Sequence, residues 1–102
     1  MTKLEDTIKQ LHDVELKIAG KELSISELKL KDAHSERAFR IEMVASQPKE
    51  PSEAKLSAEF NLSETHLRIS AEMNMARHDL SLLQVERNYF QRMLDLDMPT
   101  KG

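Results

Sequence analysis

The histidines are the residues of this chain with the widest chemical use, because imidazole both transfers protons near neutral pH and binds metal ions. There are four of them, at His12, His34, His66 and His78. None lies in a His-Glu-x-x-His pattern or at another close metal-ligand spacing. The sequence therefore predicts no metal ligands.

Residue sets for nucleophilic catalysis are equally absent from the sequence pattern. The chain contains no cysteine, which excludes thiolate chemistry and disulfides. The serines are scattered without an adjoining histidine and acid, and the two glycines, Gly20 and Gly102, are too few for a phosphate-binding loop. We therefore predict that the protein is not an enzyme, has no catalytic residues and binds no cofactor.

The composition is typical of long helices. Only two glycines and three prolines occur among 102 residues, 39% of the residues are hydrophobic, and 32% are charged with both signs interspersed. The net charge of −3 argues against phosphate-driven binding of nucleic acid. No apolar stretch is long enough to span a membrane, and charges interrupt the first 16 residues as they would not in a signal peptide. These features predict a cytoplasmic protein that does not contact membranes.

One segment, residues 46–52, contains two of the three prolines and divides the chain. Proline lacks the N–H group that a helix interior needs. Ser52 stands where an N-cap is expected, directly before Glu53. The sequence thus predicts a single module over residues 1–102, with a helix at about 3–45, a proline loop at 46–52 and a second helix at about 53–97.

Both predicted helices carry apolar residues at a seven-residue spacing, which is typical of coiled coils. In the first helix this stripe consists of Leu4, Leu11, Ile18, Ile25 and Phe39, with Asp32 interrupting it between the last two. In the second helix it consists of Leu62, Ile69, Ala76, Leu83 and Phe90. Folding the chain at the proline loop brings these stripes together, so the predicted fold is all-α, an antiparallel two-helix hairpin.

Each predicted helix also carries a second apolar stripe, which a two-helix hairpin leaves in water. Burial of one large apolar side chain contributes about 1.5–3 kcal/mol, so several exposed ones favour association. We expect the hairpin to dimerise into a four-helix bundle, although another helical protein would cover the same surface. The predicted interface residues are Leu16, Leu23, Leu30, Ile41, Phe60, Leu67, Leu82 and Tyr89.

Two local alternatives stay open. Residues 14–25 alternate apolar and polar side chains around Gly20, a pattern that also fits a β-hairpin. Asn61 is followed three positions later by Glu64, a pattern that indicates a helix start within the second helix.

Residues 56–70 carry a further pattern. Phe60, Asn61, Leu62 and Ser63 provide an apolar helix end, a turn residue, an apolar residue and a small polar cap, and Leu67 follows on the next helix. This order resembles the helix-turn-helix of bacterial repressors, although Asn61 stands where glycine is usual. The resemblance implies a DNA-binding regulator that uses residues 56–70, with Arg68 as the firm cation of its second helix.

The hairpin register also suggests a polar cluster. His34 and His66 fall at the same level of the two predicted helices, with Asp32 and Glu64 within reach. Such a cluster would make a two-histidine, one-carboxylate metal site or a pH-sensitive pair. The simpler interpretation, which we adopt, is a pair of polar surface residues. The function predicted from the sequence is thus a non-catalytic protein–protein interaction or oligomerisation module: a small adaptor, inhibitor, assembly chaperone or structural spacer.

Overall fold

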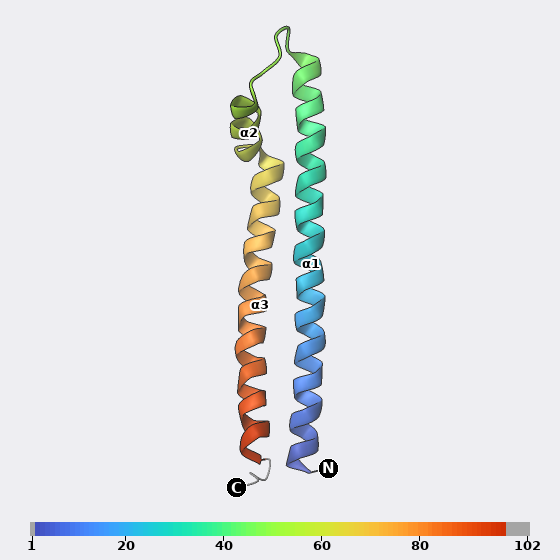
Figure 1. Ribbon diagram of the computed structural model, residues 1–102, viewed down its shortest axis with the longest axis vertical. Helices are drawn as coiled ribbons and strands as arrows, with labels where there is room; N and C mark the ends of the chain where they lie inside the picture. The colour runs from blue at the N-terminus through green and yellow to red at the C-terminus, as the bar shows by residue number, and fades with distance from the viewer. Residues whose placement is uncertain (1, 98–102) are drawn as a thin grey trace. The chain divides into compact units, whose positions relative to one another are not determined.

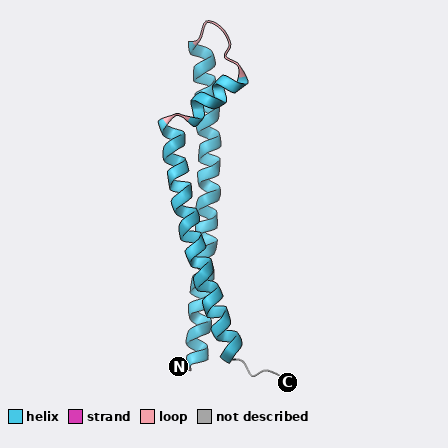
Figure 2. Cartoon of the chain, turned by 90° about the vertical axis from the view of Figure 1, so that its left-hand side faces the viewer, coloured by secondary structure: helices cyan, strands magenta, loops and turns pink. Residues whose placement is uncertain are grey.

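The computed structural model describes residues 2–97, and its regular structure in that range is all α-helical (Figure 1). Helix α1 spans Lys3–Ser46, α2 spans Glu53–Asn61 and α3 spans Glu64–Asp97. No strand occurs in residues 2–97, which confirms the predicted all-α class (Figure 2). Within the same range, no helix combines the length and the apolar character needed to cross a membrane.

Helix α1 continues through Gly20, so the alternative β-hairpin over residues 14–25 does not form. The helix begins behind Thr2, whose hydroxyl accepts a hydrogen bond from the Glu5 N–H at 3.1 Å. Glu5 and Asp6 add negative charge to the first turn, where the helix dipole favours it. These interactions and the good helix formers on both sides offset the cost of Gly20, which is about 1 kcal/mol relative to alanine.

Helix α2 begins as the sequence predicts, with Ser52 as its N-cap. The Ser52 hydroxyl accepts a hydrogen bond from the Lys55 N–H at 3.2 Å, and Glu53 occupies the first turn. Pro48 and Pro51 precede this cap and keep the preceding segment out of helix. The end of α1 and the start of α2 therefore follow from local sequence.

The predicted helix over 53–97 is interrupted after Asn61, in agreement with the alternative that a helix restarts in this region. The cap of α3 is Ser63 rather than Asn61. The Ser63 hydroxyl accepts from the His66 N–H at 3.3 Å and donates to the Phe60 carbonyl at 2.6 Å. One serine thus joins the last turn of α2 to the first turn of α3.

The chain packs as two compact units. Among the described residues, the first unit combines residues 2–24 with residues 76–97. Its buried side chains are Thr7, Leu11, Val14, Ile18 and Ala76. The Thr7 hydroxyl donates to the Lys3 carbonyl at 2.9 Å, so this buried polar group is satisfied.

The second unit comprises residues 25–75. Its buried side chains are Ile25, Leu56, Phe60, Ile69 and Met73. The Phe60 ring lies 5.6 Å from the Phe39 ring, which fixes α2 against α1. Arg40 adds polar contacts between the same helices, because it donates to Ser57 at 3.0 Å and pairs with Glu53 on α2. It also pairs with Glu36, one turn earlier on α1. The hydrogen bond to Glu53 raises the pKa of Arg40.

Candidate functional site

Large apolar side chains line the outside of α1. In the first unit Leu16 and Leu23 are each 60% exposed. In the second unit Leu30 is 60% exposed, and Ile41 and Val44 are exposed as well. Single exposed leucines are ordinary, but a row that repeats every seven residues along one helix is typical of an unfilled packing surface.

Helix α3 also carries exposed apolar side chains. Leu82, Val85 and Tyr89 belong to the first unit and Leu67 to the second. Tyr89 packs edge-on against Phe90, with ring centroids 5.5 Å apart. Phe90 is half-buried whereas Tyr89 is exposed. Phe90 therefore lies on the inner side of α3 and Tyr89 on its outer side.

Phe60 differs from the other residues predicted for the interface. It is only 2% exposed and packs between Phe39 and His66, so it belongs to the core of the second unit. The reason is the interruption at Leu62 and Ser63, which changes the helical phase between α2 and α3. The surface available to a partner therefore excludes Phe60.

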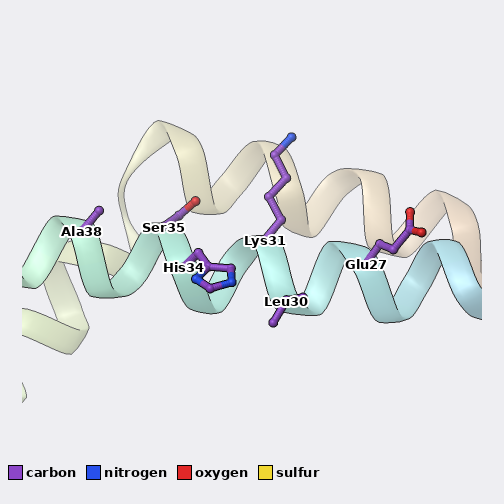
Figure 3. Close-up of a pocket in the computed structure, with 6 residues that line it drawn as sticks. All are labelled: Glu27, Leu30, Lys31, His34, Ser35 and Ala38. Atoms are coloured by element: carbon purple, nitrogen blue, oxygen red, sulfur yellow. The ribbon is translucent and has the colours of Figure 1, made fainter.

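A hollow of about 490 Å³ lies beside Leu30 on α1 (Figure 3). Its lining residues are Glu27, Leu30, Lys31, His34, Ser35 and Ala38. All of them come from successive turns of one helix, so the hollow has no opposite wall that could enclose a small ligand.

Small residues accompany the leucines of α1. Ala19, Ser26 and Ala33 each follow a leucine of the row by three positions, and all three are exposed. A Cβ atom added at Gly20 would meet nothing within 4 Å outside the backbone of its own helix. Packing within the chain therefore does not require a glycine at this position. Gly20 lies between Leu16 and Leu23 in the sequence.

The predicted cluster around the histidines forms only in part. His34 is exposed, whereas His66 is half-buried with Nδ1 at 2.9 Å from Oδ1 of Asp32. Glu64 pairs with Arg68 at 2.9 Å. Among residues 2–97, no group of three or more histidine, acidic or cysteine side chains is placed to hold a metal ion.

Ser70 completes a contact that sequence reasoning missed. Its hydroxyl oxygen lies 3.3 Å from Nε2 of His66, opposite the nitrogen that contacts Asp32. The signal in the sequence was the four-residue spacing of His66 and Ser70, which places both on one side of a helix.

Comparison with protein-family models, with curated proteins and with solved structures finds no match for this chain.

Proposed function

We propose that this chain is a protein–protein interaction and oligomerisation module, a helical hairpin that pairs with a second copy of itself in a four-helix bundle. The observation that carries this proposal is the row of exposed leucines at a seven-residue spacing on α1: Leu16, Leu23 and Leu30. Full burial of a leucine contributes about 1.5–3 kcal/mol, so covering three that are 60% exposed yields roughly 1 kcal/mol or more for each. A symmetric dimer would gain this contribution from both copies.

A second copy fits this row because leucines and small residues alternate along it. In an antiparallel pair of α1 helices, Leu16 falls opposite Ala33, Ala19 opposite Leu30, and Leu23 opposite Ser26 of the second copy. Each layer then combines one large and one small side chain. Two-fold symmetry repeats each of these pairs, so the surface is complementary to itself.

The charges beside this row support the same pairing. At this register Glu22 lies beside Lys29 of the second copy, and two-fold symmetry repeats this pair. One like-charged pair arises, Glu15 beside Glu36, but Glu36 already contacts Arg40 at 3.4 Å. Complementary flanking charges select a partner and its orientation.

The close approach that such layers allow also accounts for Gly20. A glycine within a helix costs about 1 kcal/mol relative to alanine. Nothing within the chain occupies the space around it. Beside Gly20, the backbone of a neighbouring helix has room to approach.

Two variants test this surface: Leu23→Glu and Leu30→Glu, measured by light scattering coupled to size-exclusion chromatography. We expect each variant to run as the 11.8 kDa monomer at concentrations where the parent is a dimer. The matched control is Leu62→Glu, because Leu62 is 78% exposed and lies off α1. The control should dimerise like the parent. Equal masses for the parent and both α1 variants would contradict the proposal. A parent that stays monomeric and binds another helical protein through Leu23 would show that the partner is that protein and not a second copy.

A helix-turn-helix-like regulator that binds DNA through residues 56–70 is the second candidate function. The interruption between α2 and α3 within this segment favours it. Its electrostatics are less favourable, because Arg68 pairs with Glu64 on the exposed side of α3. Duplex DNA binding that weakens with added salt and disappears in Arg68→Ala would support this candidate, and the absence of DNA binding at low salt would exclude it.

A further inference from the structure

Asp32, His66 and Ser70 form a connected series of side chains within the second unit. The Asp32 carboxylate lies 2.9 Å from Nδ1 of His66, and the Ser70 hydroxyl lies 3.3 Å from Nε2 of the same ring. A carboxylate only accepts hydrogen bonds, so the neutral imidazole carries its proton on Nδ1 and presents Nε2 as an acceptor to Ser70. This is the order of contacts that activates a serine hydroxyl: acid, imidazole, serine.

The hydroxyl of Ser70 behaves differently from those of Ser24 and Ser81. Those two serines donate to the backbone carbonyl four residues earlier, Ser24 to Gly20 at 3.1 Å and Ser81 to Arg77 at 3.1 Å. That back-bonding is common for serine in a helix. The contact of Ser70 is instead with the imidazole four residues earlier.

The imidazole of His66 is held from several sides. Its ring lies 5.0 Å from the Phe60 ring. The backbone N–H of His66 donates to the Ser63 hydroxyl at 3.3 Å, which fixes the backbone that carries the ring. The side chains of His66 and Asp32 are only 23% and 21% exposed, so water competes weakly for their contact. A general base must be held within hydrogen-bond reach of the hydroxyl whose proton it accepts, and these contacts hold the His66 ring in that position.

We propose that Ser70 is an activated nucleophile that accepts acyl groups from small activated esters, a property independent of the proposed interaction function. The Ser70 oxygen attacks the ester carbonyl carbon while Nε2 of His66 takes the hydroxyl proton. The bond from that carbon to the leaving oxygen then breaks, and His66 returns the proton to the leaving group. Attack by water, assisted in the same way, releases the carboxylic acid and restores Ser70.

The position of Ser70 determines how fast each half of this reaction proceeds. Ser70 lies in the second turn of α3, where backbone N–H groups are already engaged in helix hydrogen bonds. The site therefore lacks the free pair of N–H donors that stabilises a tetrahedral oxyanion. We expect the base to accelerate acylation by about 10²-fold, which is the lower end of the range for general base catalysis. We expect the acyl-serine to persist, because without these N–H donors its hydrolysis is slow.

The test uses the intact protein and a short-chain fluorophosphonate, which labels activated serines. The Ser70 oxygen bonds to phosphorus, the phosphorus–fluorine bond breaks, and fluoride leaves as His66 accepts the proton. Peptide mass spectrometry should find the label on Ser70 at least tenfold faster than on Ser81, the exposed control serine of the same helix. Equal labelling of both serines would overturn the proposal.

Two further variants separate activation from simple access to the hydroxyl. Asp32→Asn and His66→Gln should each slow labelling of Ser70 about tenfold or more while leaving Ser81 unchanged, because a properly oriented base is lost. Circular dichroism checks that both variants keep the helical content of the parent. Should Ser70 remain fast in folded Asp32→Asn and His66→Gln, its reactivity would not come from this series of side chains, and the proposal would be wrong.

Discussion

The imidazole of His66 on α3 contacts the carboxylate of Asp32 on α1 at 2.9 Å, and both side chains are about one-fifth exposed. This contact connects residues 34 positions apart and lies next to the cap that starts α3. It is better shielded from water than the other ion pair between the two helices, Lys21 with Asp79, whose side chains are 32% and 52% exposed.

A double-mutant cycle on Asp32→Ala and His66→Ala should therefore give a coupling free energy of about 1 kcal/mol in urea unfolding, because a shielded, well-oriented contact is lost in both single variants. The same cycle on Lys21 and Asp79 should give less than about 0.5 kcal/mol, as is usual for exposed pairs. Equal coupling in both cycles would show that shielding does not distinguish the two contacts.

Replacing Phe60 by alanine should lower the free energy of unfolding by about 3–5 kcal/mol, since this removes a ring that is 2% exposed and packed against Phe39. Leu62→Ala, two positions away and 78% exposed, should change the same quantity by less than about 0.5 kcal/mol. Urea titrations of both variants at one protein concentration make the comparison. A small effect at Phe60 would mean that α2 does not pack as described.

The cap of α3 leads to another expectation. Ser63→Ala removes the acceptor for the His66 N–H and the donor to the Phe60 carbonyl, so it should cost about 1–2 kcal/mol of unfolding free energy. Ser81→Ala, which removes only a back-bond within a continuous helix, is the control and should be near neutral. Hydrogen exchange at the first turn of α3 should also accelerate in Ser63→Ala, and unchanged exchange there would rule out a capping role.

A substitution at Gly20 should change the stability of the monomer and the affinity of the proposed dimer in opposite directions. Because an added Cβ meets nothing within 4 Å, Gly20→Ala should stabilise α1 by about 1 kcal/mol in dilute solution, where the proposed dimer would dissociate. The same variant should weaken the proposed dimer, since the methyl group obstructs a closely packed partner helix. Thermal unfolding at low concentration and light scattering at high concentration measure the two effects. A variant that both stabilises the monomer and dimerises more tightly would place Gly20 outside the interface.

Much of this fold follows from the sequence. The seven-residue stripe predicts that Leu11, Ile18, Ile25 and Ile69 are buried, as they are, because apolar side chains at this period share one side of a helix. The same stripe wrongly assigns Leu62 to the core, since Leu62 lies at the interruption after α2 and is 78% exposed. The cap at Ser52 is likewise a local property of the residues around it.

The remaining features depend on the interruption after Asn61, which the sequence leaves open. If the helix continued through residue 61 at 100° per residue, Phe60 would belong to the outer stripe. Because the helix is interrupted there, the Phe60 side chain instead points into the core. The side chains around His66 differ from the predicted cluster for a related reason: the register places His34 level with His66, whereas the imidazole contacts Asp32 through Nδ1 and Ser70 through Nε2. Which polar side chain is met across a helix pair depends on rotamers that a repeat does not specify.

The register of the proposed dimer can be tested through its charges. Glu22→Lys and Lys29→Glu should each weaken association about tenfold or more at low salt, because like charges then face each other twice in the symmetric pair. The double variant restores opposite charges and should recover most of the affinity. Two single variants that are neutral, or a double variant that is weaker than both, would exclude this register.

The central claim, that the outer leucines of α1 bind a second copy of the chain, is tested most directly by sedimentation equilibrium of the unmodified protein over a wide concentration range. The proposal predicts a mass that rises with concentration from 11.8 kDa to twice that value and no further. A mass that stays at 11.8 kDa at every concentration, with those leucines left in water, would contradict it.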